Sequence, residues 1–449
     1  MKVVFIFPGI AETGFNKSGQ PIEYCWLHQG LCTISASTKA KGHSVELIDL
    51  RELSGWDEVR AKIKELSPDV IGITVMDVDK DFAIESAKIA KSCDSRIKVV
   101  IGGPYASLVP KEASSFSSID HVIVGEGEIS FTKLLDDIEK GRPSEKVIMG
   151  EPPDLDKLPF ADRELFHFQE QPLERFLQLP FVTLIAGRGC GHDCSYCQPA
   201  ERMIFGNRIR RRSVANTIEE LKILRDKYDF QSILFNDDSF TQNRKWIFEF
   251  CEEYIKNKFR KPFICQSRAD IIVKNEDMVR LMKRAGLCMF IIGFESGNQR
   301  ILDFLRKRTT VETNLKAAKL CRKIGVRIWA NYMLGIPTET KEEVMDTVNM
   351  ILKIRPYRPS PTFFSPHPGT DLFDFCNEHN LSIVERSVDY LRSSSKPKVK
   401  NIDYDFIQQA IKMSKKRFLD VRLARKIDFI REQRIKQPLR KFCTSLKLQ

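Results

Sequence analysis

The stretch FVTLIAGRGCGHDCSYC, at residues 181–197, decides how the rest of the chain is interpreted. It begins with an apolar run over 181–186, which has the length and composition of a buried strand. A loop with two glycines follows, and then three cysteines, Cys190, Cys194 and Cys197, in C-x3-C-x2-C spacing. The pattern predicts a strand whose exit loop carries a metal-binding group of thiols.

Three thiolates so close together can bind three irons of a four-iron cluster and leave the fourth iron without a protein ligand. A structural zinc site would need a fourth Cys or His nearby, and His192 in the same loop keeps zinc open as the alternative. The other nine cysteines are scattered singly, and we expect small buried hydrophobic side chains there rather than disulfides. They are Cys25, Cys32, Cys93, Cys251, Cys265, Cys288, Cys321, Cys376 and Cys443.

Downstream of this stretch, short apolar runs alternate with helical patterns. Six strands in such a series predict a partial (β/α)6 barrel rather than a closed barrel of eight strands. The expected strands are 181–186, 232–236, 263–267, 289–293, 327–334 and 362–365, and the expected helices are 214–228, 244–259, 275–285, 311–324 and 341–354.

Upstream, the first 140 residues or so show the same alternation, which is typical of a doubly wound parallel sheet. The expected strands are 3–7, 44–50, 70–75, 98–101 and 121–124, and the expected helices are 24–41, 56–66, 80–93 and 128–140. Several strands end in turns of small or acidic residues. Because ligands bind at the carboxyl ends of parallel strands, we expect these turns to face one crevice.

The chain is therefore predicted to be an α/β protein with a doubly wound, Rossmann-like domain, a partial barrel and a helical end. We place the domains at 1–145 and 179–375, a linker at 146–178 and a mostly helical, basic region at 376–449. The linker contains the segment 151–160, whose prolines and charges continue neither pattern.

The net charge of +12 is uneven, because residues 412–447 carry thirteen Lys or Arg against three acidic residues. Such a segment can meet an acidic protein, an anionic membrane or nucleic acid, or it can be a solvated helix face. We see no zinc-finger spacing and no aromatic RNA-binding signature, and no apolar run reaches the roughly 18 residues that span a bilayer. We expect a cytoplasmic monomer that binds no nucleic acid.

The cysteine spacing, with Tyr196 before the third cysteine, resembles the radical S-adenosylmethionine (SAM) superfamily. The resemblance implies a [4Fe-4S] cluster on Cys190, Cys194 and Cys197, with the open iron binding SAM. It also implies that Arg268 pairs with the SAM carboxylate. The further cofactor contacts it assigns are Tyr196, Asp238, Glu295, Ser296, Gly335 and Ile336. Of these, Glu295 or Ser296 would lie near the ribose, and the backbone of Gly335 and Ile336 would flank the adenine. Asp238 and its neighbour Asp237 are alternatively expected to orient substrate or to cap the next helix.

The amino-terminal domain resembles the cobalamin-binding domains of the B12-dependent radical SAM group. The resemblance implies that small residues in its turns let backbone N–H groups approach the corrin and its nucleotide tail. No D-x-H-x-x-G motif is present, so we expect no histidine below the cobalt. The expected cobalamin contacts are Met76, Asp77, Gly102, Gly103, Gly125, Glu126 and Gly127, with Met76 nearest the metal. A purely structural or nucleotide-type domain is the alternative.

Together the two resemblances imply a class B radical SAM methyltransferase. Such an enzyme removes a hydrogen atom from an unactivated carbon with a 5′-deoxyadenosyl radical and transfers a methyl group from methylcobalamin, so no strong base is needed. An external electron donor is required. The layout and the basic tail are similar to those of enzymes acting on a peptide or protein, such as a glutamine of methyl-coenzyme M reductase. Cyclisation, rearrangement, methylation of a small molecule (an antibiotic intermediate, a lipid or a tetrapyrrole) and a non-enzymatic sensor are the alternatives.

Overall fold

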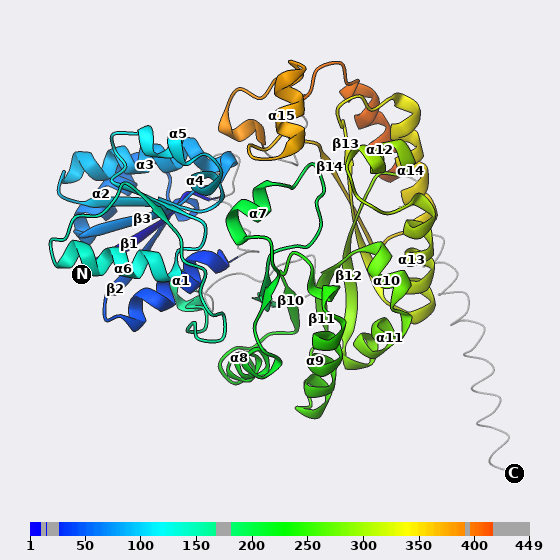
Figure 1. Ribbon diagram of the computed structural model, residues 1–449, viewed down its shortest axis with the longest axis horizontal. Coiled ribbons are helices and arrows are strands. Elements are labelled where there is room, and N and C mark those ends of the chain that lie inside the picture. Colours follow the sequence, from blue (N-terminus) through cyan, green and yellow to red (C-terminus); the bar gives the residue numbers. More distant parts are fainter. Residues whose placement is uncertain (10–14, 16–26, 168–180, 391–395, 416–449) are drawn as a thin grey trace, which may run out of the picture.

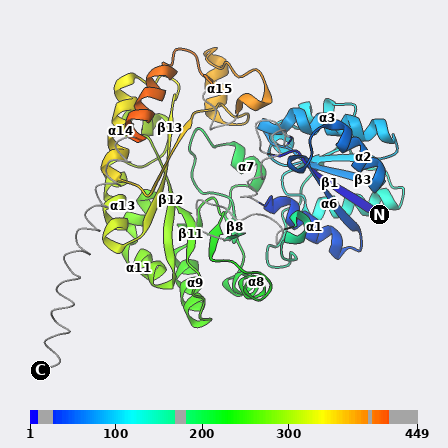
Figure 2. The same cartoon turned by 180° about the vertical axis from the view of Figure 1, so that it is seen from behind.

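Two parallel six-stranded sheets form the body of the molecule and lie side by side in the computed structural model (Figure 1). The structure describes residues 1–9, 15, 27–167, 181–390 and 396–415. Figure 2, from behind, shows the same arrangement, with helix α7 (Ala200–Phe205) between the two sheets.

The first sheet has the strand order β2-β1-β3-β4-β5-β6. Its strands are nearly continuous apolar runs because helices cover both faces. One face packs against α1 (Gln29–Ala40) and α6 (Glu128–Glu139), and the other packs mainly against α2 (Trp56–Leu66) and α3 (Lys80–Cys93). The strands are β1 (Lys2–Phe7), β2 (Ser44–Asp49), β3 (Val70–Thr74), β4 (Lys98–Gly102), β5 (His121–Val124) and β6 (Val147–Met149). The short helices α4 (Pro104–Leu108) and α5 (Pro110–Ser115) follow β4. The predicted doubly wound domain is confirmed.

The second sheet runs in the sequential order β7-β10-β11-β12-β13-β14, as expected for a partial barrel. Its strands are β7 (Phe181–Leu184), β10 (Ser232–Phe235), β11 (Phe263–Ser267), β12 (Leu287–Glu295), β13 (Arg327–Leu334) and β14 (Arg358–Phe363). The large apolar core lies between these strands and the helices α8 (Val214–Lys227), α9 (Arg244–Lys256), α10 (Ala269–Lys274), α11 (Glu276–Ala285), α13 (Val311–Ile324) and α14 (Lys341–Ile354). A smaller cluster that includes Phe181, Met289 and Trp329 forms a separate apolar core. The predicted six-stranded barrel is confirmed.

Several strand bounds differ from the sequence expectation: β7 is shorter and β12 longer than expected, and two further differences alter the ends of the sheets. The first sheet continues into β6, beyond the expected domain end at residue 145. The last barrel strand begins at Arg358 rather than Thr362, although Pro359 and Pro361 lie within it. Proline is tolerated there because β14 is an edge strand, where a missing N–H breaks no ladder on the outer side.

The region after the barrel is helical where it is described, as expected. It contains α15 (Asp371–Glu378), a short 3-10 helix (Ser387–Tyr390) and a helix over 404–415. Most of the basic segment 412–447 lies outside the described residues, as do Cys25 and Cys443. In the described ranges, no helix combines the length and apolar character required to cross a bilayer.

Candidate active site

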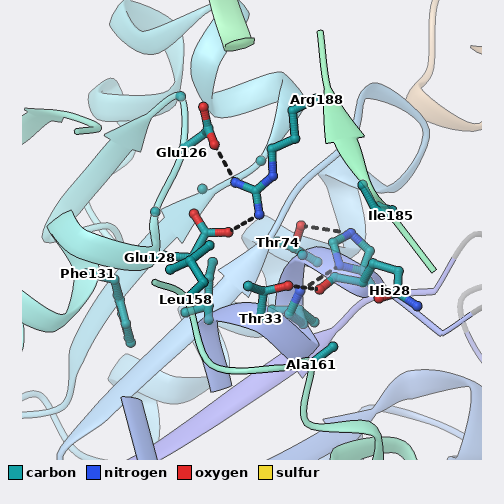
Figure 3. Close-up of a pocket in the computed structure, with 18 of the residues that line it drawn as sticks. His28, Thr33, Thr74, Glu126, Glu128, Phe131, Leu158, Ala161, Ile185 and Arg188 are labelled. Atoms are coloured by element: carbon teal, nitrogen blue, oxygen red, sulfur yellow. Dashed lines mark hydrogen bonds and ion pairs between the residues drawn. The ribbon is translucent and has the colours of Figure 1, made fainter. Parts of the chain in front are cut away.

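A cavity of about 360 Å³ lies between the two domains, where their strand ends face each other. The first sheet contributes Thr74 and the turns after β4 and β5 to its wall, and the linker contributes residues between Leu155 and Ala161. The barrel contributes Gly187 and Arg188 from the loop that leads to the cysteines, and Asn236 and Asp238 from the end of β10. Figure 3 shows how Arg188 and Ile185 approach the residues of the first domain. The cavity therefore contains the turns predicted to bind cobalamin and, of the predicted SAM contacts, Asp238, whereas the three cysteines do not line it.

The glycine turns predicted to approach a corrin line this cavity. Gly102, Gly103, Gly125, Glu126 and Gly127 all form part of its wall. Gly103 has φ +94°, and a Cβ atom there would lie 2.9 Å from the Thr74 hydroxyl and 3.0 Å from the Val75 backbone oxygen. Only glycine fits this turn. The first domain therefore presents backbone and small residues to the cavity, which fits a large, mostly neutral ligand such as a corrin.

Met76 and Asp77, also predicted to contact cobalamin, are not part of the cavity wall. Asp77 instead accepts a hydrogen bond from His367 of the barrel, with 3.1 Å between Oδ2 and Nδ1. The backbone N–H of Met76 donates to Asp79 Oδ1 at 2.7 Å. The loop after β3 thus contacts the barrel rather than forming the floor of the cavity.

His28 lines the cavity, although its sequence context gave no reason to select it. Its Nδ1 accepts the N–H of Leu31 at 3.0 Å and so caps α1. Nε2 then carries the proton and lies 3.4 Å from the Thr74 hydroxyl. Burial lowers the pKa of His28 to about 4, so the ring is neutral. His28 falls inside the helix expected over 24–41, so no local signal in the sequence distinguished it.

The three clustered cysteines are free thiols on a tightly turned loop. The Cys194 carbonyl accepts N–H groups from Cys197 at 3.0 Å and Gln198 at 2.8 Å. The N–H of Ser195 donates to the carbonyl of Leu305 at 3.0 Å and fastens the loop to the barrel. Burial raises the pKa of Cys190 to about 11 and that of Cys197 still further. These thiols therefore need a bound metal centre to become thiolates.

Within the described ranges, no three Cys, His, Asp or Glu side chains converge on a point where a single metal ion would bind. A cluster takes its sulfur ligands on separate irons, so its cysteines need not converge in that way. The donor set therefore fits a cluster with three protein ligands.

Arg268 and Glu295 lie at the same barrel mouth as the cysteines. Nη1 of Arg268 is 3.9 Å from Cys194 Sγ, while Nε donates to Asp270 at 2.9 Å and Nη2 to the Lys307 carbonyl at 2.6 Å. Glu295 accepts a hydrogen bond from the Tyr196 hydroxyl at 2.9 Å. Burial and the Glu295 charge raise the pKa of Tyr196 well above its usual value, so it remains a phenol.

Lys307 completes this network, although the sequence pattern did not select it. Its ammonium group donates to Glu295 at 2.9 Å and to the Tyr196 hydroxyl at 3.0 Å, and the residue is 7% exposed. The lysine thus pairs with a buried carboxylate beside the cluster loop. No sequence signal identifies it, because its partners are distant along the chain.

The remaining predicted SAM contacts are held by protein partners. Ser296 is buried, with its hydroxyl 3.1 Å from that of Thr347. The N–H groups of Gly335 and Ile336 donate to Glu339 at 2.7 Å and 3.2 Å. Glu339 therefore fixes the backbone of the loop predicted to flank the adenine.

The two aspartates after β10 have different surroundings. Asp237 is buried, accepts the N–H of Ala186 at 3.0 Å and pairs with Arg211, which indicates a structural role. Asp238 is exposed on the cavity wall. Neither caps the next helix, because Asn243 does. Helix capping is thus excluded for both aspartates, and Asp238 is the one of the two that lines the cavity.

Glu201, on α7, is a further acidic residue that the sequence did not single out. It faces Asp238, and burial raises the pKa of Glu201 to about 7, with the Asp238 charge adding to the shift. Its Oε2 lies 3.5 Å from Cys197 Sγ. Glu201 therefore lies between Cys197 of the cysteine loop and Asp238 of the cavity wall.

Several other side chains near the barrel mouth pack in apolar clusters or lie at the contact with the first domain. His367 stacks on Tyr390 with ring centroids 5.3 Å apart, at the contact with the first domain. Tyr332 is buried in the large core. Trp329 and Phe364 are buried in apolar clusters.

Comparison with known proteins assigns both domains. The Radical SAM superfamily model matches residues 184–351, and the B12 binding domain model matches residues 19–135. These matches confirm the predicted pairing of domains, and with it a [4Fe-4S] cluster, SAM and cobalamin as the cofactors. The residue below the cobalt, the domain boundaries and the individual site residues stay predictions.

Relatives and a solved structure agree with this assignment. An uncharacterized methyltransferase of Pyrococcus horikoshii is 29% identical over 86% of this chain and 85% of its own. The anaerobic magnesium-protoporphyrin IX monomethyl ester cyclase of Rubrivivax gelatinosus is 28% identical over 83% of this chain and 69% of its own. TsrM of Kitasatospora setae, a radical SAM methyltransferase solved with cobalamin and a [4Fe-4S] cluster, shares the fold. Its TM-score is 0.66 at 17% identity, over 84% of this chain and 78% of that one.

Proposed function

We propose that this chain, which combines a B12 binding domain with a Radical SAM superfamily domain, is a cobalamin-dependent radical SAM methyltransferase. It transfers a methyl group to a carbon atom of its substrate, in the cavity between the two domains. One observation carries the proposal. The cavity wall combines the glycine turns of the B12-binding domain with Arg188 and Asp238, which adjoin the cysteine loop. The predicted cobalamin turns and the residues beside the cluster loop therefore share one cavity.

When bound, the cluster, SAM and cobalamin supply an organic radical and a methyl group. Cys190, Cys194 and Cys197 would hold the cluster, and Lys307 and Arg268 would bind the SAM carboxylate. Among the described residues, the Lys307 ammonium uses two of its three donors, on Tyr196 and Glu295. Its third hydrogen supports a role in binding an anion.

The protein's own contribution is positioning and exclusion of water. The linker lines the cavity with Leu155, Leu158 and Phe160, and Arg212 lies over the Phe160 ring at 5.4 Å. Asp156 accepts the N–H of Ser213 at 2.8 Å and fastens the linker to the barrel. The linker therefore forms part of the cavity wall and is attached to the barrel.

We propose that no histidine binds the cobalt from below. His28 is the histidine on the described cavity wall, and its Nδ1 is used to cap α1. Its Nε2 therefore carries a proton and has no lone pair for a metal. Met76 has no place on the wall, so its predicted position below the cobalt gains no support.

The substrate we propose is a peptide or protein side chain, with a glutamine of methyl-coenzyme M reductase as the specific example. The support is the layout of the chain and its basic carboxyl-terminal segment. An external electron donor, action as a monomer and the lack of a nucleic-acid partner belong to the same proposal. The similarity to the magnesium-protoporphyrin ester cyclase favours a second candidate, cyclisation or methylation of a small molecule such as a tetrapyrrole.

The test is anaerobic reconstitution with iron, sulfide and methylcobalamin, followed by SAM, reductant and candidate substrates. Formation of 5′-deoxyadenosine and S-adenosylhomocysteine, with one methyl group gained on a peptide, supports the proposal. Deoxyadenosine alone, with a tetrapyrrole converted, supports cyclisation. A protein that binds cobalamin but yields neither product contradicts both.

A further inference from the structure

Arg188 lies between the two cofactor sites. It ends the short strand β8 (Gly187–Arg188), two residues before Cys190. Its guanidinium extends out of the barrel to two carboxylates of the first domain, Glu126 and Glu128 (Figure 3). A single side chain thus joins the cysteine loop to the turn after β5.

The contact consists of charge-assisted hydrogen bonds in a mostly buried setting. Nη1 of Arg188 donates to Glu126, and Nη2 donates to Glu128 Oε1 at 2.5 Å. The side chains of Glu126 and Glu128 are 3% and 4% exposed, and that of Arg188 is 16% exposed. Arg210 also pairs with Glu126, so two guanidinium groups balance two carboxylates. Removing one partner leaves a buried charge uncompensated.

The receiving turn is held tightly on its other side. A Cβ atom at Gly150 would lie 2.3 Å from the backbone oxygen of Glu126, so the end of β6 packs directly against this turn. The Gly150 N–H also donates to the Val124 carbonyl at 2.7 Å. Glu128 begins α6, which covers one face of the sheet. A displacement of Arg188 therefore moves the cavity wall rather than being absorbed by a loose loop.

Geometry also explains why arginine occupies this position. The fork of a guanidinium reaches two carboxylates at once, whereas an ammonium group acts as a point charge. Arg188 lines the cavity together with Gly125 and Gly127. Arg188 thus lines the cavity proposed for cobalamin, and it also belongs to the loop proposed to bind the cluster.

Building on the proposed function, we propose that Arg188 is a positioning residue that fixes the cluster-bearing loop against the cobalamin-binding turn. Its role is to couple SAM cleavage to methyl transfer. Without this contact the cluster still binds and cobalamin binds less tightly, and the two cofactors are misplaced relative to each other. SAM is then cleaved without a matching methyl transfer.

The test compares full-length wild type with Arg188→Gln, Arg188→Lys and the double variant Arg188→Gln/Glu128→Gln. Arg244→Gln is the matched control, because Arg244 forms an exposed pair with Asp277 away from the cavity. The first measurement, made without SAM, is the Kd of methylcobalamin from its visible spectrum, with iron content determined in parallel. The second is the ratio of 5′-deoxyadenosine to S-adenosylhomocysteine during turnover.

We expect Arg188→Gln to retain iron and to raise the product ratio several-fold. The cobalamin Kd should rise about tenfold, because the turn that borders the cobalamin space loses the hydrogen bonds that hold it in place. The double variant should regain thermal stability but not the product ratio, and Arg188→Lys should be intermediate. Arg244→Gln should match wild type in both measurements.

Unchanged Kd and ratio in Arg188→Gln would overturn the proposal, as would loss of iron with normal cobalamin binding. Full recovery of the product ratio in the double variant would mean that Arg188 only balances the charge of Glu128, and this result would also overturn the proposal. If Arg188→Gln does not fold, a wild-type product ratio in Arg188→Lys would overturn the proposal. A wild-type protein that binds no cobalamin would instead contradict the proposed function.

Discussion

The walls of the two predicted cofactor sites are built from different materials. The B12-binding domain offers glycine turns and backbone, with Gly102, Gly103 and Gly125 at its strand ends. The barrel mouth offers thiols and buried charges that lie outside the cavity lining, with Arg268 3.9 Å from Cys194 Sγ and donating to the Lys307 carbonyl. The first wall selects a large ligand by shape, and the second binds by coordination and charge. Changes in the two walls should therefore have different kinds of effect.

The sharpest separation of the two walls is expected from Cys194→Ala. Removing a cluster ligand should abolish 5′-deoxyadenosine formation and lower bound iron, while cobalamin binding persists because its wall contains none of the cysteines. The measurements are iron content, the visible spectrum of bound cobalamin and product analysis. Cys376→Ala, a free cysteine in an apolar cluster, is the control and should retain activity. Continued SAM cleavage by Cys194→Ala would contradict the ligand assignment.

Lys307→Met tests the charged wall without touching the cluster ligands. It removes a buried cation beside Glu295, so we expect the Kd for SAM to rise about 10- to 100-fold, with cobalamin binding unchanged. Equilibrium binding of SAM to the reconstituted protein measures this.

Lys341→Met is the matched control, because Lys341 pairs with Asp403 in an exposed position. A normal SAM affinity in Lys307→Met would mean that this lysine only neutralises Glu295.

The difference between the walls also explains what the sequence could predict. The strands of both sheets were predictable because buried parallel strands are continuous apolar runs, and the cluster ligands were predictable because they are neighbours along the chain. Lys307 meets Tyr196 across 111 residues, and Arg188 meets Glu128 across 60. Contacts of this kind depend on the folded arrangement and leave no local pattern.

Other differences have local physical causes. Strand β6 is short and only partly buried, so its apolar signal is weak. Met76 was expected at the cavity because it follows a central strand. The chain instead turns into a 3-10 helix at Asp77–Asp79 that faces the barrel. The sequence pattern predicted where this loop occurs along the chain but not that it contacts the barrel instead of lining the cavity.

Gly103→Ala tests recognition by shape in the first wall. A Cβ atom at this left-handed residue would collide with the Thr74 hydroxyl and the Val75 backbone, so we expect a loss of about 1–3 kcal/mol in the free energy of unfolding and weaker cobalamin binding. Chemical denaturation and a cobalamin titration measure the two effects.

Gly42→Ala separates close approach from backbone strain. Gly42 has a similar φ of +86° but nothing within 4 Å of a Cβ atom, so its substitution should cost stability alone. Equal cobalamin affinities in the two variants would show that the Gly103 turn does not approach the ligand.

The smallest effect is expected at His28 and appears only in acid. Burial lowers its pKa from 6.5 to about 4, so the unfolded chain takes up a proton more readily than the folded one. His28 should thus contribute a loss of stability that begins as pH falls below 6.5 and is complete near pH 4, with no effect above that range. His28→Asn keeps a capping side chain for α1 but removes this titration. Denaturant unfolding of apo-protein at pH 7.5 and pH 5 should give a smaller pH difference for His28→Asn than for wild type or for His121→Asn, whose ring hydrogen-bonds the Glu145 carbonyl in an exposed position. An identical pH difference in all three proteins would mean that the His28 ring is solvated rather than sealed in the cavity wall.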